Sequence, residues 1–249
     1  MKVMELLVDI GNSRIKWCDR QGLLRTDVAS ASCGDLQQML DQQWSRLRGV
    51  DSVWVSSVAA AGLVDKLTAW VGQSWGLSPR LARTLPAQLG VVNGYDKPGQ
   101  LGVDRWLALI GARDLFNRAL VIADCGTATT IDAMEQSGRH LGGLILPGLR
   151  LMRESLLGQT AIEAIPDSTM LGPWARDTAG GIDAARLLST VGLVERVAAA
   201  LRARVGGEVL CVLTGGSAQA IKDILHMNVY HEPNLVLQGL ALVARAGES

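Results

Sequence analysis

Two segments of this chain, far apart in the sequence, share a pattern of residue types that can bind phosphate. They span residues 6–17 and 121–132, and each has an apolar run ending in Asp, one further residue, a Gly, a polar turn and a second β-rich run. In such a hairpin the backbone N–H groups of the turn can face an anion, while the Asp holds a metal ion directly or through water. The residues that could do this are Asp9, Gly11, Asn12, Ser13 and Lys16 in the first copy, and Asp124, Gly126, Thr127 and Thr129 in the second.

One such hairpin alone is most simply an ordinary tight turn whose Asp bonds its own backbone. Two copies in matching strand contexts favour a shared, duplicated design that could clamp a triphosphate. A third turn, Thr214-Gly215-Gly216-Ser217, follows a predicted strand and opens a predicted helix. It either seats a nucleotide at the helix N-terminus or simply connects strand to helix, with Ser217 as the N-cap.

A carboxylate and a guanidinium stand side by side where a long loop is expected to enter a helix, in the sequence Gly102-Val103-Asp104-Arg105. Phosphoryl transfer to an alcohol uses a carboxylate that accepts the hydroxyl proton, and Asp104 could be that base. Arg105 could then contact an acceptor carboxylate or a transferring phosphate in a bidentate manner. The alternative is that Asp104 caps the helix while Arg105 lies on its solvated face.

The elements that must position these residues alternate between strand and helix, which predicts an α/β protein. Besides the two hairpins, β-rich runs predict strands at residues 52–58, 141–146 and 209–214. Apolar residues at three-to-four spacing predict helices at residues 35–47, 62–71, 103–116, 148–157, 178–204 and 217–224.

The long segment of residues 77–102 is rich in Pro, Gly, Asn and Asp, so it is expected to run as a surface loop. We place a domain boundary just before the second hairpin. The sequence therefore predicts an N-terminal lobe of residues 1–117 and a C-terminal lobe of residues 118–249, with a nucleotide cleft between them.

Composition excludes several classes of protein. The 249 residues are 48% hydrophobic and 19% charged, which suits a globular chain. Lys plus Arg and Asp plus Glu both total 24 and no basic run occurs, so no nucleic-acid partner is expected. No apolar stretch is long enough for a signal peptide or a membrane span, and the four cysteines are scattered as reduced thiols would be. We expect a cytoplasmic protein without a membrane partner.

Together, the motifs of this chain resemble those of the type III pantothenate kinases in order and spacing. They are Asp9-Xaa-Gly11-Asn12-Ser13, Gly102-Xaa-Asp104-Arg105, Asp124-Xaa-Gly126-Thr127-Ala128-Thr129-Thr130-Xaa-Asp132, Gly142-Gly143-Xaa-Ile145-Xaa-Pro147-Gly148, Thr214-Gly215-Gly216 and a tail from Glu232 to Gly239. The resemblance implies a two-lobed actin-like ATPase (ribonuclease H-like) fold and a homodimer. It also implies ATP-dependent phosphorylation of pantothenate, the first step of coenzyme A synthesis, with Mg²⁺ and a monovalent cation, K⁺ or NH₄⁺.

The resemblance also assigns residues. Asp104 would be the catalytic base and Asp124 the ligand of the monovalent cation, while Asp9 is a candidate magnesium ligand. The ATP-binding residues would be Asp9, Ile10, Gly11, Asn12, Ser13, Arg14, Ile15, Lys16 and Thr127. The pantothenate-binding residues would be Tyr95, Gly102, Val103, Asp104, Arg105 and Thr178. The chain departs from the family at Asp177, where Asn is common, and a carboxylate there would repel a carboxylate substrate unless it is paired.

Three other functions fit part of the sequence. The phosphate hairpins are shared across the superfold, so a kinase acting on another small alcohol would carry them too. A regulatory or accessory protein of the same fold could bind nucleotide without catalysis, although the four intact residues Asp9, Asp104, Arg105 and Asp124 argue against a dead enzyme. A filament-forming actin relative would need additional subdomains for which the chain is short.

Overall fold

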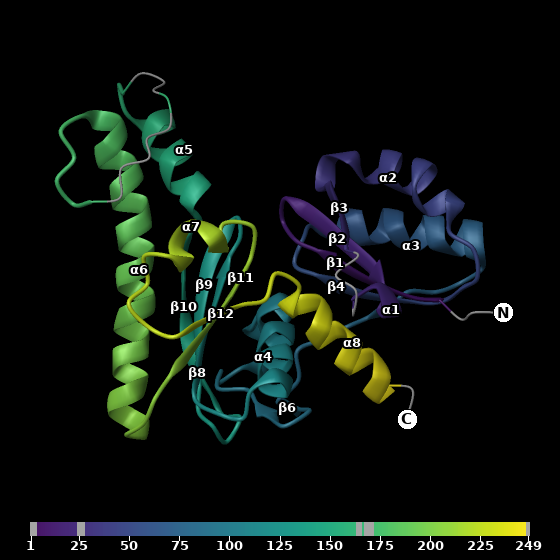
Figure 1. The fold of residues 1–249 in the computed structure, drawn as a ribbon. Helices are drawn as coiled ribbons and strands as arrows, with labels where there is room; N and C mark the ends of the chain where they lie inside the picture. Colours follow the sequence, from purple (N-terminus) through teal and green to yellow (C-terminus); the bar gives the residue numbers. More distant parts are fainter. Residues whose placement is uncertain (1–3, 24–27, 163–165, 167–171, 248–249) are drawn as a thin grey trace. The chain divides into compact units, whose positions relative to one another are not determined.

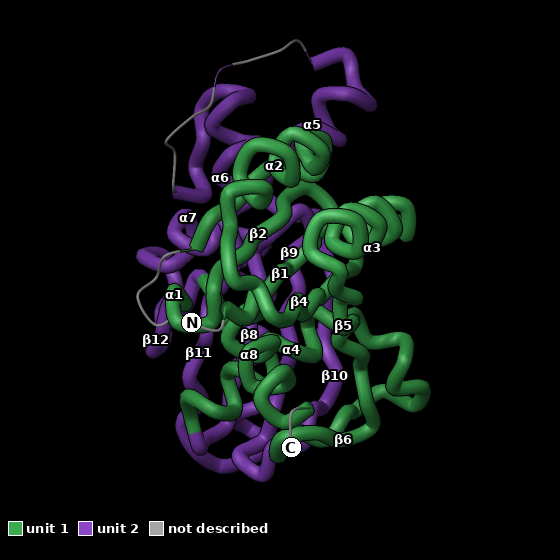
Figure 2. Tube along the Cα trace, turned by 90° about the vertical axis from the view of Figure 1, so that its right-hand side faces the viewer, with its two compact units in different colours: residues 1–116, 234–249 green, residues 117–233 purple. Residues whose placement is uncertain are grey.

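The computed structural model describes residues 4–23, 28–162, 166 and 172–247 (Figure 1). The chain divides into two compact units, coloured separately in Figure 2. Unit 1 comprises residues 1–116 and 234–249, and unit 2 comprises residues 117–233. The predicted lobes, residues 1–117 and 118–249, differ from these units in the last helix, which follows unit 2 in the sequence but packs within unit 1.

The sheet of unit 1 has five strands in the order β3-β2-β1-β4-β5. The hairpin of β1 and β2 is antiparallel, as is the pair β2 and β3, whereas β4 and β5 run parallel to β1. The strands are β1 (Met4–Ile10), β2 (Arg14–Asp19), β3 (Ala29–Ser32), β4 (Val50–Ser57) and β5 (Arg80–Leu81).

Alternation along β1 decides which residues face which helices, because successive side chains of a strand point to opposite faces. Val8 and Ile10 lie in a buried cluster with residues of α2 (Leu36–Gln42) and α3 (Ala61–Trp75). Four tryptophans of the chain contact one another at this face of the sheet: Trp17, Trp44, Trp70 and Trp75. Asp9 therefore points to the opposite face, where α4 (Val103–Leu115) and α8 (Leu235–Gly247) pack.

The last helix, α8, is the main element that the sequence analysis did not assign. It crosses α4 so closely that a Cβ on Gly239 would overlap the backbone of Leu107. Gly111 of α4 makes the matching approach to α8, where an added Cβ would lie 2.7 Å from the carbonyl oxygen of Leu235. The two glycines explain why the C-terminal helix belongs to unit 1.

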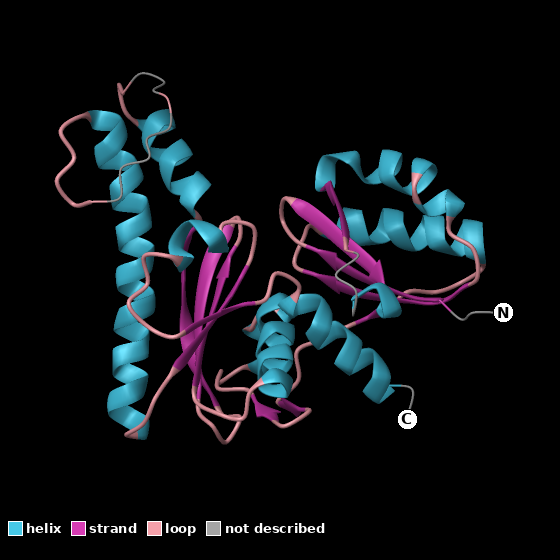
Figure 3. Ribbon diagram, viewed as in Figure 1, coloured by secondary structure: helices cyan, strands magenta, loops and turns pink. Residues whose placement is uncertain are grey.

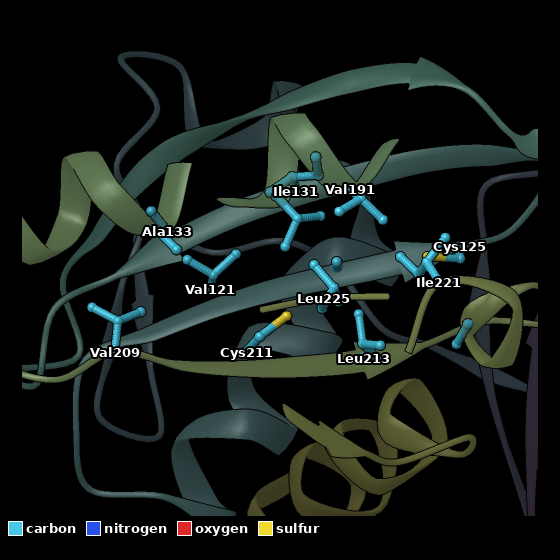
Figure 4. Packing of buried hydrophobic residues seen from close by; sticks show 14 of the residues in the cluster. Val121, Cys125, Ile131, Ala133, Val191, Val209, Cys211, Leu213, Ile221 and Leu225 are labelled. Atoms are coloured by element: carbon cyan, nitrogen blue, oxygen red, sulfur yellow. The ribbon is translucent and has the colours of Figure 1, made fainter. Parts of the chain in front are cut away.

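Unit 2 repeats the same sheet, in the order β10-β9-β8-β11-β12, with the same antiparallel and parallel pairs. Its strands are β8 (Leu120–Cys125), β9 (Ala128–Met134), β10 (His140–Pro147), β11 (Leu210–Thr214) and β12 (Val229–His231). Its helices are α5 (Leu149–Gln159), α6 (Thr178–Val205) and α7 (Ala218–Lys222). Figure 3 shows the long α6 lying along this sheet. Val121, Ile131, Cys211 and neighbouring residues pack with Val191 of α6 in a buried cluster (Figure 4).

The identical strand orders confirm the predicted duplication and the α/β class. The predicted strands at residues 52–58, 141–146 and 209–214 are β4, β10 and β11, within two residues at each end. The predicted helices also form, except that the first ends at Gln42 and passes into a short 3₁₀ turn at Trp44–Arg46. The segment of residues 77–102 is mostly irregular, as expected, but includes β5 and a small hairpin of β6 (Ala87–Gln88) and β7 (Val91–Val92).

Candidate nucleotide and acceptor site

The first phosphate hairpin ends β1 with Asp9 and Ile10 and begins β2 with Arg14, Ile15 and Lys16. Between the strands, Gly11, Asn12 and Ser13 form a turn that the Gly11 amide closes by donating to the carbonyl oxygen of Arg14, at 3.0 Å. Ile10 and Ile15 point into the core toward α2 and α3. Their side chains are therefore out of reach of a ligand on this turn, and only their backbone groups could contact ATP.

Asp9 occupies an unusual electrostatic environment. It lies between Lys16 on β2 and Ser56 on β4, with which it is paired across the sheet. Burial of the carboxyl group, and next the nearby Asp104 carboxylate, raise the pKa of Asp9 to about 6, against smaller lowering effects of Ser56 and Lys16. Its Oδ1 atom is buried and has no hydrogen-bond partner among the described residues. A bound cation would stabilise the charged form of such a buried carboxylate more than that of an exposed one.

The start of α4 brings the predicted acceptor residues together. Gly102 precedes the helix, and Val103, Asp104 and Arg105 form its first turn. Asp104 Oδ1 accepts a hydrogen bond from the Arg105 amide at 2.7 Å, while the carboxyl group lies close enough to Asp9 to raise its pKa. The structure therefore places the candidate base beside the first phosphate hairpin, within one unit.

Arg105 is not on a solvated helix face, because only 5% of it is exposed. Its Nη1 donates to the Tyr95 hydroxyl at 2.7 Å, and the guanidinium carbon lies 5.5 Å from the centre of the Tyr95 ring. Tyr95 in turn is held by a bond from its amide to Asn93 Oδ1, at 3.0 Å. The loop and the helix thus form one connected structure around the guanidinium.

In unit 2, the second hairpin has the same construction. Asp124 is paired with Thr130 on β9 and with Thr214 on β11, and Thr127 lies exposed at the turn. The Gly148 amide, just before α5, donates to the Thr127 carbonyl oxygen at 2.9 Å, and the Ser217 amide donates to the Cys125 carbonyl oxygen, also at 2.9 Å. The three glycine-bearing motifs of this half of the chain therefore meet at one end of the sheet.

Thr178 is the first residue of α6, is exposed and belongs to unit 2, unlike the other predicted pantothenate residues. The neighbouring Asp177 is the N-cap of α6 and accepts a hydrogen bond from the Gly180 amide at 2.8 Å. The carboxylate that departs from the family pattern is therefore paired with the helix N-terminus, which suits a negative charge. Its repulsion of a carboxylate ligand is reduced accordingly.

Ser56 is the site residue that the sequence analysis missed. The available signal was a polar residue at the end of a predicted strand, but nothing in the sequence showed that this strand lies beside β1. Among the described residues, no three His, Cys, Asp or Glu side chains gather as a metal cluster, and no helix is long and apolar enough to cross a membrane.

A duplicated five-stranded sheet with an Asp at the same position of each hairpin defines the actin-like ATPase fold. Two solved structures share the fold over nearly their whole length. MreB 5 of Spiroplasma citri bound to AMPPNP has a TM-score of 0.50 and 10% identity, covering 100% of this chain and 98% of its own. A conserved Campylobacter jejuni protein assigned to the Baf family has a TM-score of 0.63 and 17% identity, covering 98% of each chain.

The family follows from sequence comparison. The family model for type III pantothenate kinase matches residues 5–200. The type III pantothenate kinase of Nitrosococcus oceani is 36% identical over 250 residues, which cover 97% of this chain and 94% of that protein. This chain belongs to the type III pantothenate kinase family.

Proposed function

We propose that this protein phosphorylates the primary hydroxyl of pantothenate with ATP, giving 4'-phosphopantothenate, the first step of coenzyme A synthesis. Family membership supports the reaction. The observation that carries the chemistry is the position of Asp104, a carboxylate at the start of α4 and close to Asp9 of the first phosphate hairpin. A proton acceptor is thereby held next to the expected site of phosphoryl transfer.

In this mechanism the phosphates of ATP bind the turn that follows Asp9, and the turn that follows Asp124 is the second phosphate-binding candidate, in unit 2. Asp104 accepts the proton of the acceptor's hydroxyl group. The hydroxyl oxygen attacks the γ-phosphorus of ATP in line, and the bond between the γ-phosphorus and the bridging oxygen of the β-phosphate breaks. Arg105 anchors the acceptor. The hydrogen bond from Arg105 to Tyr95 fixes the plane of the guanidinium, so little side-chain freedom is lost when the substrate binds.

A divalent cation fits the Asp9 end of the site, because Asp9 Oδ1 is a buried carboxylate oxygen without a partner among the described residues. Mg²⁺ prefers such oxygen ligands and neutralises phosphate charge when bound. At the second hairpin, Asp124 beside the hydroxyl residues Thr130 and Thr214 is an oxygen donor set that suits a hard cation. We propose a monovalent cation, K⁺ or NH₄⁺, there on the strength of the family resemblance.

We further propose a homodimer in the cytoplasm, where ATP is available. Strand β10 lies at the edge of its sheet and exposes Leu144 and Ile145, the latter by 65%. An exposed apolar edge strand is prone to pair with other chains and aggregate. A second copy of this chain that covers β10 would prevent such pairing. Light scattering of the purified protein would give the mass of the assembly.

The direct test is phosphorylation of pantothenate by purified protein with Mg²⁺ and ATP, in K⁺ or in a large inert cation. We expect turnover that requires K⁺. Asp104→Asn should lower kcat by roughly 10²- to 10⁴-fold, the usual contribution of general base catalysis. Asp114→Asn is the matched control, because Asp114 is exposed near the end of the same helix.

An Asp104→Asn enzyme with wild-type turnover would remove the base assignment. If folded protein does not phosphorylate pantothenate in either cation, a panel of acceptor alcohols separates a kinase with another substrate from a protein that binds nucleotide without catalysis.

A further inference from the structure

Ser56 at the end of β4 is a buried hydroxyl that hydrogen-bonds the Asp9 carboxyl group. It is 0% exposed, and its hydrogen bond lowers the pKa of Asp9 against the larger raising effect of burial. Leaving a buried hydroxyl without a partner costs stability, so most buried polar groups in native proteins are paired. The Ser56 hydroxyl is therefore held against the carboxylate of Asp9.

The side chain of Ser56 faces the same way as Asp9. The two residues are paired across the parallel strands β4 and β1, and paired residues on neighbouring strands point to the same face of a sheet. Asp9 Oδ1 is a buried oxygen without a hydrogen-bond partner among the described residues. Lys16 is paired with Asp9 on the other side, so the carboxylate has a cation at one flank and the hydroxyl at the other.

We propose that Ser56 Oγ and Asp9 Oδ1 together hold the divalent cation that accompanies ATP, either directly or through one of its coordinated water molecules. This inference rests on the proposed kinase function and adds a residue to its metal site. Ser56 Oγ is a neutral hydroxyl oxygen and Asp9 Oδ1 is a carboxylate oxygen, and Mg²⁺ prefers oxygen ligands. A cation or its water would satisfy Asp9 Oδ1, and the Ser56 hydroxyl that donates to Asp9 keeps acceptor lone pairs for the same cation.

The internal repeat supports this inference independently. In unit 2 the strand equivalent to β4 is β11, and the residue paired with Asp124 is Thr214, which is 2% exposed. A hydroxyl side chain therefore stands beside the hairpin Asp at the same sheet position in both units. Two buried hydroxyls at equivalent positions favour a common role at the strand ends.

The test measures metal binding without turnover. Mn²⁺ serves as a paramagnetic probe in the presence of a non-hydrolysable ATP analogue, and its free concentration is read by electron paramagnetic resonance. Ser56→Ala should weaken Mn²⁺ binding about tenfold, the effect of one lost contact with a charged group. The unfolding temperature should fall only slightly, because the variant loses one buried hydrogen bond to Asp9.

Ser57→Ala is the matched control. Ser57 is paired with Ile10, which faces the core on the opposite side, and its Oγ accepts a bond from the Ala59 amide at 3.3 Å. This variant should bind Mn²⁺ as the wild type does. If Ser56→Ala does not fold, Ser56→Cys fills the same space with an atom that is a poor ligand for hard cations, and is expected to weaken binding too.

Wild-type Mn²⁺ affinity in a folded Ser56 variant would overturn the proposal. Since pantothenate is absent from this experiment, its outcome is separate from that of the proposed function. A wild-type protein that binds Mn²⁺ through Ser56 yet does not phosphorylate pantothenate would refute the acceptor assignment alone.

Discussion

Replacing Gly215 with Ala should destabilise unit 2 and disturb the site of Asp124. Gly215 has a φ of +89°, in the region that side chains with a Cβ rarely adopt. An added Cβ would lie 2.6 Å from both the backbone N and C atoms of Cys125, and it would also overlap Asp124 Oδ1. The left-handed backbone costs about 1–2 kcal/mol and forcing a methyl group into packed backbone about 1–3 kcal/mol. We therefore expect a loss of roughly 2–5 kcal/mol in the free energy of unfolding.

Urea unfolding measures this loss, and Gly216→Ala provides the control. A Cβ on Gly216 meets nothing within 4 Å, so this neighbouring variant should be nearly as stable as the wild type. In the kinase assay, Gly215→Ala should also need more K⁺ for half-maximal rate, because the methyl group displaces the Asp124 carboxylate. Equal stability of Gly215→Ala and wild type, or an equal loss in Gly216→Ala, would refute the reasoning.

Three further predictions concern other parts of the molecule. Tyr95→Phe removes the hydroxyl that accepts a hydrogen bond from buried Arg105, so KM for pantothenate should rise by about tenfold with a smaller change in kcat, as steady-state kinetics would show. Asp183→Asn removes the negative charge of a buried carboxylate whose Oδ1 lies 2.9 Å from Arg153 Nη1 and from Arg186 Nε. The free energy of unfolding, measured with urea, should fall by about 3–5 kcal/mol. Burial raises the pKa of three of the four cysteine thiols to about 12, so at pH 8 they stay protonated, and a thiol reagent should label native protein far more slowly than unfolded protein.

Much of the fold was predictable because its signals are local. An apolar strand that ends in Asp-Xaa-Gly specifies a hairpin through the turn residues alone, and its recurrence at residues 121–132 predicts the duplication. Apolar spacing predicted the helix α6, whereas the role of Asp177 as its N-cap came only from the structure. α8 also carries a local signal, apolar residues at helical spacing, which the sequence analysis did not use. Its place in unit 1 depends instead on the close approach of Gly239 to Leu107, residues far apart in the sequence.

The sequence by itself determined the family, the two phosphate hairpins and the candidates Asp104 and Arg105, since each is a short motif whose residue types carry their own chemistry. Only the tertiary structure decided which of these groups share an environment. Parallel pairing places Ser56 beside Asp9, helix packing brings Asp104 near them, and the fold of the loop puts the Tyr95 hydroxyl on Arg105. The physical reason is that burial and charge proximity depend on contacts between distant strands and helices, and these contacts raise the pKa of Asp9.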